Sequence, residues 1–294
     1  GDFMSNFILP TDSGCDLPLE LLNQQGVFTL KMSYSLNGEI FTDTMNPDDY
    51  KEFYAKMRNG AVPKPSQLNV SDFMNFFTPL VGKCKNIVYV SLSSGVSGTY
   101  NNAVTAAKEL KETLGANIHV VDSLMCSTGY GALVLKAARM RDDGCDAEQC
   151  ANWLNENKLN LNTYYTTDDL TYLTRSGRCS KTSAILGTIF KICPILNVIE
   201  NGKLNVCERA RGFKKAMQKI GQLIAETVEN AAKQTLYICH SDVIERAKEF
   251  GQFLLTSIGF KDVLYTDIGT IIGSNCGPGV VAAFYFGKSR ATKA

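Results

Sequence analysis

The apolar positions in the first half of the chain follow two alternating periods. Short β-branched runs, such as residues 118–121, are typical of strands. Each run is followed by a stretch with apolar residues at helical spacing, such as residues 128–141. Strand and helix alternate with short connections up to about residue 157. This order predicts a parallel sheet with helices on both faces, joined by right-handed crossovers.

The pattern changes after about residue 157, where hairpin signals mix with helical stretches. Asn201 and Gly202 predict a hairpin across residues 195–206, and residues 213–233 predict the longest amphipathic helix. Residues 184–192 are apolar and are expected to form a helix that Pro194 ends. We therefore expect an α/β protein of two domains. The N-terminal α/β domain takes residues 4–157, and the C-terminal α+β domain takes residues 158–290.

Composition and charge exclude several functional classes. The 294 residues carry a formal net charge of +1 without a run of five like charges, which gives no reason to expect nucleic-acid binding. The apolar run at residues 280–286 is far shorter than the ~20 residues of a membrane-spanning helix, so we expect no stable membrane insertion. With no export signal at the start, we expect a cytoplasmic protein with reduced thiols. The ten cysteines and two histidines lack the close pairing of a zinc site, and no metal is expected.

The stretch VYVSLSSGVSGTYNNA at residues 88–103 is the strongest candidate for a binding site. A strand runs through serines and glycines into an Ala-rich helix, which places hydroxyls and free N–H groups at a helix N-terminus. That end of a helix attracts anions. The alternative is an ordinary turn in which one serine caps the helix. Four serines and a threonine within nine residues are more than one cap requires.

Known catalytic motifs fit the chain poorly. Gly95-Val-Ser97-Gly98 is not G-x-S-x-G, because Thr99 occupies the final glycine position. Asp12 and Asp122 are candidates for a carboxylate pair, although such residues more often cap helices. No nucleophile and base stand together in the sequence. A serine hydrolase or transferase therefore remains an alternative that needs a base close to one of the loop serines.

Seven fragments, in order and spread over nearly the whole chain, resemble the DegV family. They are TDSGCDLP (11–18), PSQ (65–67), SLSSGVSGTYNNA (91–103), VVDS (120–123), YLTRSGR (172–178), RARGFKKA (209–216) and GPG (277–279). The resemblance implies a two-domain bacterial cytosolic protein whose second domain contains a mixed sheet. It also implies that the protein is not an enzyme, needs no cofactor and binds a long-chain fatty acid such as palmitate. A separate fatty acid kinase would then phosphorylate the bound carboxylate.

The family motifs carry over to positions that would hold the carboxylate. The implied ligand-binding set is Ser66, Ser93, Ser94, Ser97, Arg211 and Asn275. Two positions depart from the family pattern, because Pro65 stands where the family has Thr and Asn275 where it has His. The first change removes a hydroxyl and the second a possible positive charge, so the affinity for the headgroup is expected to be lower or the ligand different. A binding module for another small carboxylate or a phosphate ester therefore stays open as an alternative.

The acyl tail would be held by apolar side chains. Because each buried methylene contributes about 0.8 kcal/mol, a chain of ~14 carbons dominates the affinity even with a weakened headgroup site. The candidate lining residues are Ala184, Ile185, Leu186, Ile189 and Phe190. The alternative for these five residues is an ordinary place in the hydrophobic core.

Overall fold

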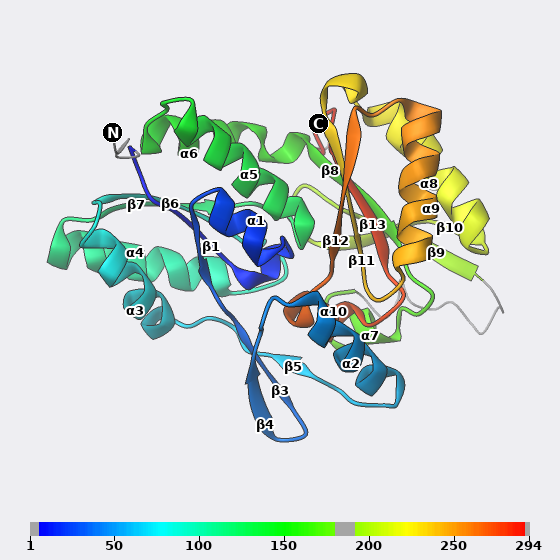
Figure 1. Ribbon diagram of the computed structural model, residues 1–294, viewed down its shortest axis with the longest axis horizontal. Coiled ribbons are helices and arrows are strands. Elements are labelled where there is room, and N and C mark those ends of the chain that lie inside the picture. Colours follow the sequence, from blue (N-terminus) through cyan, green and yellow to red (C-terminus); the bar gives the residue numbers. More distant parts are fainter. Residues whose placement is uncertain (1–5, 180–191, 292–294) are drawn as a thin grey trace.

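Two β-sheets, one from each half of the chain, organise the computed structural model, which describes residues 6–179 and 192–291. Figure 1 shows the two sheets in separate lobes, with the N-terminal lobe in blue to green and the C-terminal lobe in green to red. The first sheet is parallel and the second is mixed. The predicted α/β fold class with these two kinds of sheet is confirmed. The domain boundary at residue 157 stays a prediction.

The parallel sheet has the strand order β2-β1-β6-β7. Its strands are β1 (Leu9–Asp12), β2 (Val27–Leu30), β6 (Asn86–Ser91) and β7 (Asn117–Asp122). Hydrogen bonds of Ile8 with residues 86 and 88 join β1 to β6. Because both faces are covered, β6 is apolar along most of its length.

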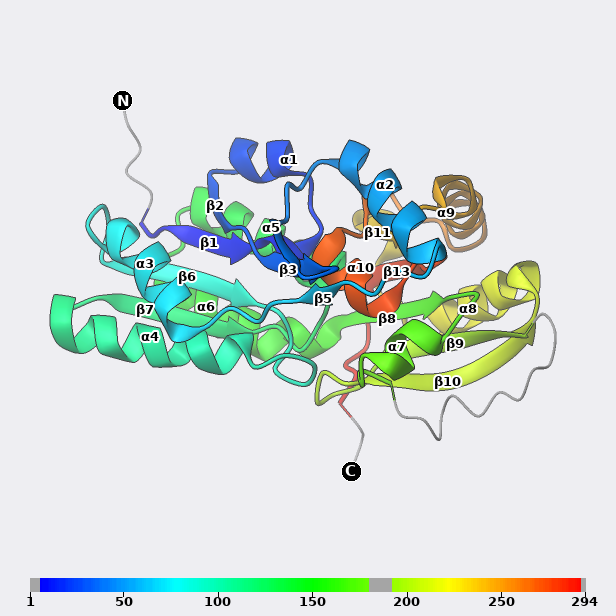
Figure 2. The ribbon, with the colours of Figure 1, turned by 90° about the horizontal axis from the view of Figure 1, so that it is seen from below.

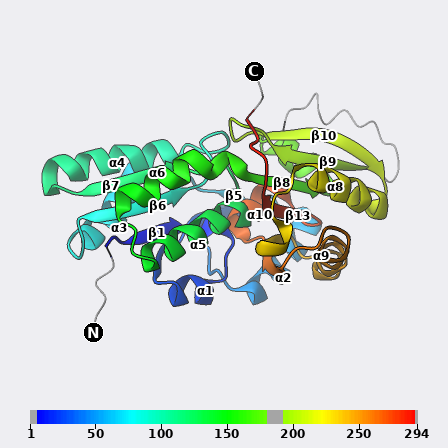
Figure 3. The same ribbon diagram turned by 90° about the horizontal axis from the view of Figure 1, so that it is seen from above.

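Helices cover the parallel sheet on both sides, as Figure 3 shows from above. They are α1 (Leu19–Gln24), α3 (Val70–Val81), α4 (Thr99–Leu114), α5 (Thr128–Asp142) and α6 (Ala147–Asn157). Ile87 and Tyr89 share a core cluster with α3 and α4, whereas Val88 and Val90 share one with α5 and α6. Successive residues of a strand point to opposite faces of the sheet, and in β6 both faces pack against helices.

The mixed sheet has the strand order β10-β9-β8-β13-β11-β12. Its strands are β8 (Leu161–Thr166), β9 (Ile192–Val198), β10 (Leu204–Arg211), β11 (Thr235–His240), β12 (Asp262–Asp267) and β13 (Val281–Phe286). Helices α8 (Phe213–Thr227) and α9 (Ile244–Ile258) pack on its outer face. Its other face is turned toward the N-terminal lobe, and its buried residues join the large core cluster that contains α5.

A third, small sheet and three further helices lie below the two large sheets in Figure 1, on the side that faces the viewer in Figure 2. The sheet consists of β3 (Ser33–Leu36), β4 (Glu39–Thr42) and β5 (Lys64–Pro65), and the helices are α2 (Pro47–Arg58), α7 (Thr171–Arg175) and α10 (Thr270–Cys276). The sequence pattern predicts one strand over residues 27–34. The structure divides it, because the chain leaves the parallel sheet after Leu30 and enters the small sheet at Ser33.

The sequence analysis misplaces the ends of two predicted helices. The amphipathic helix predicted to reach Lys233 stops at Thr227, and Val228 pairs with Gly287 instead. Pro194, expected to end a helix, lies inside β9. The ladder of β9 with β8 begins at Ile195, so the missing N–H of Pro194 falls outside it. The helix predicted over residues 184–192 lies outside the described residues, except for Ile192, which begins β9.

Candidate functional site

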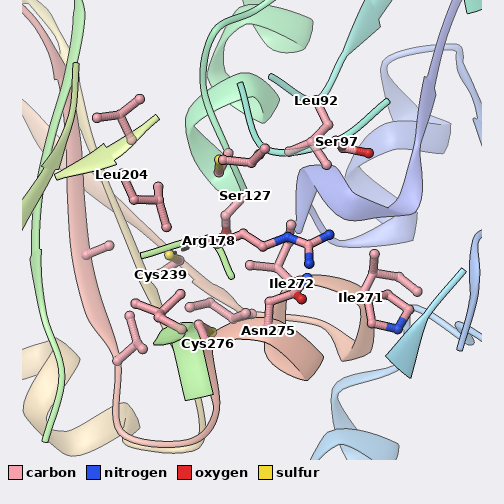
Figure 4. Close-up of a pocket in the computed structure, with 18 of the residues that line it drawn as sticks. Leu92, Ser97, Ser127, Arg178, Leu204, Cys239, Ile271, Ile272, Asn275 and Cys276 are labelled. Carbon is pink, nitrogen blue, oxygen red and sulfur yellow. Dashed lines mark hydrogen bonds between the residues drawn. The ribbon is translucent and has the colours of Figure 1, made fainter. Parts of the chain in front are cut away.

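A pocket lies between the serine-rich loop of the first lobe and the mixed sheet of the second. Its empty space is about 930 Å³, open mouth included. Figure 4 shows Leu204 and Cys239 on the sheet side of the pocket. The guanidinium of Arg178 lies on the other side, together with Ser97 and Asn275. The pocket therefore has an apolar wall and a polar end.

Ser97 stands at the polar end because β6 leads through the serine-rich loop into α4. Its hydroxyl lies 3.0 Å from the Thr99 hydroxyl and accepts a hydrogen bond from the Thr99 N–H at 3.3 Å. The predicted transition from strand through serines to helix is thus present, and Ser97 is half-buried at the beginning of the helix. The hydroxyl and the helix N-terminus both favour a negative group here.

The loop before α3 closes against the serine-rich loop. The Gln67 side chain accepts a hydrogen bond from the Gly98 N–H at 3.2 Å. A Cβ on Gly98 would come within 2.6 Å of the Gln67 amide nitrogen, so a side chain at this position would displace the end of the Gln67 side chain. The contact brings Ser66 and Gln67, both exposed, to the rim of the pocket.

Arg178 supplies the positive charge at the polar end. Among the described residues that line the pocket it is the single charged side chain, and it is exposed. Its guanidinium donates to the Ser176 carbonyl at 2.5 Å, and the Ser176 hydroxyl donates to the Asn275 carbonyl at 3.4 Å. The loop that follows α7 is therefore linked to α10, which carries Asn275 to the same end of the pocket.

The apolar wall comes mainly from one face of the mixed sheet. Strand register places Tyr165 opposite Ala282 and Thr163 opposite Phe284, and all four residues line the pocket. Three cysteines also contribute to the lining. Burial raises the pKa of Cys126 and Cys239 to about 12 and that of Cys276 well above its usual value. These thiols stay protonated and behave as small apolar groups.

Asp16 fixes the position of two segments that line the pocket. Its carboxylate accepts hydrogen bonds from the Ser127 hydroxyl and from the Gly269 N–H, the latter at 2.9 Å, just before α10 begins. Burial raises the pKa of Asp16 well above its usual value, although these two hydrogen bonds act in the opposite direction. Asp16 thus ties the first lobe to the helix that carries Asn275.

The carboxylates of Asp12 and Asp122 have separate partners. Asp12 accepts hydrogen bonds from the hydroxyls of Tyr89 and Tyr130 at 2.6 and 2.7 Å in the core. Asp122 accepts from the N–H groups of Ser94 and Leu124 at 3.0 and 3.1 Å. Neither lines the pocket. Asp12 also caps the 3-10 turn Ser13–Cys15, as the capping alternative expects, whereas Asp122 caps no helix of the described residues.

The structure brings three of the six sequence-predicted ligand residues to the pocket: Ser66, Ser97 and Asn275. It does not bring Arg211 there. Arg211 is exposed at the end of β10, where alternate residues of this edge strand face solvent. Arg178, which does line the pocket, belongs to the YLTRSGR fragment at residues 172–178. The resemblance includes that fragment but implies Arg211 as the arginine that holds the carboxylate.

Ser93 and Ser94 also lie outside the pocket lining. The Ser93 hydroxyl is fully buried, donates to the Gly202 carbonyl at 2.9 Å and accepts from the Gly95 N–H at 3.0 Å. The bond to Gly202 holds the serine-rich loop against the β9–β10 turn, and the bond from Gly95 lies within the loop. Ser94 is exposed. The proposed tail-lining residues 184–190 lie outside the described residues.

Two negative findings concern the described ranges only. Within residues 6–179 and 192–291, no helix has the length and apolar character needed to cross a membrane. In the same ranges, no group of His, Cys, Asp and Glu residues is arranged to hold a metal ion.

Comparison with known proteins gives a consistent result. A family model described as "Uncharacterised protein, DegV family" matches residues 7–288. A DegV domain-containing protein of Clostridium perfringens is 34% identical over 289 residues, which cover 98% of this chain and 99% of the relative. A fatty-acid-binding DegV family protein of Thermus thermophilus is 27% identical with a TM-score of 0.85, covering 97% of this chain and 100% of the other. DegV of Bacillus subtilis, described as a fatty acid binding protein, is 26% identical with a TM-score of 0.83 and the same coverage.

Proposed function

Because the chain belongs to the DegV family, we propose that the pocket between its lobes binds a long-chain fatty acid. The carboxylate lies at the polar end, where Arg178, Ser97 and Asn275 surround it. The tail lies along the wall formed by Val198, Ala282 and their neighbours. Relatives with solved structures, from Thermus thermophilus and Bacillus subtilis, are described as binding fatty acids.

The observation that carries this proposal is the division of one pocket into a singly charged end and an apolar wall. A fatty acid has the same division, with one charge at the end of a chain of methylenes. Each buried methylene contributes about 0.8 kcal/mol, so the wall provides most of the affinity. The arginine and the hydroxyl fix which end enters first, because hydrogen bonds to charged groups are about twice as strong as neutral ones.

Arg178 can compensate for the two positions, Pro65 and Asn275, at which the chain departs from the family pattern. Pro65 lacks the hydroxyl, and Asn275 lacks the possible charge, that the resemblance assigns to their positions. A guanidinium keeps its charge at every physiological pH and offers several donors in one plane. In this proposal Arg178 replaces the lost charge, and Ser66 beside Pro65 offers a hydroxyl at the rim.

The second part of the proposal is that the protein presents the bound carboxylate to a separate fatty acid kinase in the bacterial cytoplasm. Arg178 and Ser66 are both exposed, so a carboxylate held between them remains accessible from solvent. The kinase would transfer a phosphoryl group from ATP to a carboxylate oxygen. This chain holds the acid and shields its tail, while the chemistry takes place in the partner.

The serine-hydrolase alternative requires a base within hydrogen-bond reach of a loop hydroxyl. The candidates are Ser93, Ser94 and Ser97. The Ser93 hydroxyl bonds to Gly202 and Gly95, the Ser97 hydroxyl contacts Thr99, and Ser94 bonds to Asp122 through its backbone N–H. No histidine or carboxylate of the described ranges is hydrogen-bonded to any of the three hydroxyls. The geometry therefore favours binding over catalysis.

Lipid extraction followed by mass spectrometry tests the first part of the proposal. We expect the protein purified from a bacterial host to carry long-chain fatty acids, and the stripped protein to melt at higher temperature when they are added. A melting point that rises with small polar carboxylates or phosphate esters, but not with fatty acids, would support the other-anion alternative. Adding a fatty acid kinase and ATP to the loaded protein tests the second part, with acyl phosphate as the expected product.

A further inference from the structure

Two hydroxyls on the sheet wall of the pocket have no hydrogen-bond partner in the described structure. Thr163 is 2% exposed and Tyr165 is 7% exposed, and both line the pocket from β8. Their side-chain oxygens are buried and unpaired among the described residues. Buried polar groups are nearly always hydrogen-bonded, so an unpaired pair on one strand requires an explanation.

The strand neighbours of these two residues in the sheet are apolar. Tyr165 lies opposite Ala282 on one side and Leu196 on the other, and Thr163 lies opposite Phe284. Burial raises the pKa of Tyr165 well above its usual value, so its hydroxyl keeps the proton and remains a donor. An alkyl chain that filled the pocket would leave both hydroxyls without partners and away from water, which is unfavourable.

The same sheet satisfies equivalent hydroxyls on its helix-covered face. The Tyr285 hydroxyl lies 2.6 Å from that of Thr227 on α8. The Thr166 hydroxyl donates to the Pro194 carbonyl at 2.7 Å. On the helix-covered face the protein provides a partner for one tyrosine and one threonine, whereas on the pocket face the described residues provide none for Tyr165 and Thr163. This contrast indicates that the partners of Thr163 and Tyr165 come from the ligand.

We propose that the pocket selects long-chain fatty acids that carry a hydroxyl on the chain, which Tyr165 and Thr163 recognise. This inference rests on the proposed fatty-acid site. Figure 4 shows Leu204 and Cys239 of the sheet across the pocket from Arg178. We therefore assign the carboxylate to the Arg178 end and a second oxygen, on the chain, to the sheet. One alcohol group offers a donor and two acceptor sites, which is enough for both side chains.

The test compares octadecanoic acid with a series of its monohydroxy derivatives, each carrying the hydroxyl at a different carbon. The stripped full-length protein is titrated with each acid by displacement of a fluorescent fatty acid. We expect at least one positional isomer to bind about tenfold more tightly than octadecanoic acid, because it pairs groups that the plain chain leaves unpaired. Equal or weaker binding of every isomer, with normal binding of octadecanoic acid, would overturn the inference and leave the proposed function intact.

Two variants assign the effect to these side chains. Tyr165→Phe combined with Thr163→Val keeps the shape of the wall, and we expect it to bring the ratio between the affinities for the hydroxylated acid and for octadecanoic acid close to one. Tyr285→Phe, on the other face, is the matched control and should keep the preference. A preference that survives the double variant would contradict the assignment. If neither plain nor hydroxylated acids bind the wild-type protein, the proposed function itself fails and this inference falls with it.

Discussion

The two faces of the mixed sheet come from the same strands but meet different neighbours. On β13, Ala283 and Tyr285 pack under α8 and α9, whereas Ala282 and Phe284 point to the pocket. Both faces are apolar, and both alternate with period two. The two faces differ in what packs against them. Two amphipathic helices cover one face, whereas part of the other face is free to contact a ligand. A hydrophobic face alone therefore does not distinguish core from binding site.

The largest expected effect comes from replacing an alanine of β13 by leucine, on the pocket face or on the helix-covered face. Ala282→Leu places a larger side chain in the pocket and displaces about three or four methylenes of the acyl chain. At about 0.8 kcal/mol each, this weakens the binding of long-chain fatty acids by roughly a hundredfold. The melting temperature of the ligand-free protein should change little. Fluorescent displacement and thermal melting together give both readings.

Ala283→Leu is the matched variant on the other face. It overpacks the core under α8 and α9, so we expect a loss of ~1–3 kcal/mol in the free energy of unfolding. The affinity of the folded protein for fatty acids should remain that of the wild type. Identical behaviour of the two variants would remove the distinction between the faces.

The second comparison concerns two arginines, one at the polar end of the pocket and one on the edge strand β10. Arg178→Ala should weaken fatty-acid binding by about 10- to 100-fold, because hydrogen bonds to charged groups contribute ~1.5–3 kcal/mol. Arg211→Ala should leave the affinity unchanged. Isothermal titration of both variants measures this difference. A larger loss for Arg211→Ala would restore the assignment made from the sequence.

Two serines of the loop that faces the sheet differ in the same manner. Ser93→Ala removes the donor to the Gly202 carbonyl and the acceptor for the Gly95 N–H, so unfolding should become easier by about 1–3 kcal/mol. Ser97→Ala removes a hydroxyl at the polar end, which should weaken binding a few-fold. It also removes the acceptor for the Thr99 N–H, but because Ser97 is only half-buried, the loss of stability should be smaller than that of Ser93→Ala. Denaturant unfolding and binding titrations separate the two effects. Loss of affinity without loss of stability in Ser93→Ala would contradict the placement of that hydroxyl.

The smallest effect concerns the buried carboxyl groups behind the pocket. Burial raises the pKa of Asp12, Asp16 and Asp43 above the unfolded value of 3.8. Each group therefore favours folding fully below that value, and this contribution is lost as the pH rises through the folded pKa. Asp16→Asn removes one titrating group and retains an acceptor for the Gly269 N–H. We expect its melting temperature to fall less between about pH 5 and pH 8 than that of the wild type.

A surface variant provides the reference for this pH series. Glu112→Gln changes an exposed acid on α4 and should reproduce the wild-type pH dependence. If Asp16→Asn shows the same pH dependence as Glu112→Gln, then Asp16 does not contribute to it.

Much of the fold could be predicted from the sequence, because its signals are local. The passage from β6 into α4, the hairpin at Asn201 and Gly202, and the alternation that forms the parallel sheet all depend on neighbouring residues. Where the sequence misplaces the end of a helix, the cause is a contact with a residue far along the chain. Val228 leaves its helix to pair with Gly287, a residue far along the chain, and no local pattern signals that partner.

The site was predictable to a lesser degree for the same reason. Ser97 follows from the strand–loop–helix pattern and Asn275 from the resemblance, and both line the pocket. The choice between Arg178 and Arg211 depends on which way two separate segments face after folding, which a linear motif does not contain. The proposed role of Thr163 and Tyr165 depends on the absence of hydrogen-bond partners for their hydroxyls in the described structure. A sequence alone does not show which hydroxyls lack partners.

A crystal structure of the protein loaded with a long-chain fatty acid is the most direct test of this account. We predict that the chain follows the wall formed by Ala282 and Phe284, with its carboxylate hydrogen-bonded to Arg178 and Ser97. A fatty acid bound elsewhere, or one with its carboxylate beside Arg211 and no contact to that wall, would contradict the account.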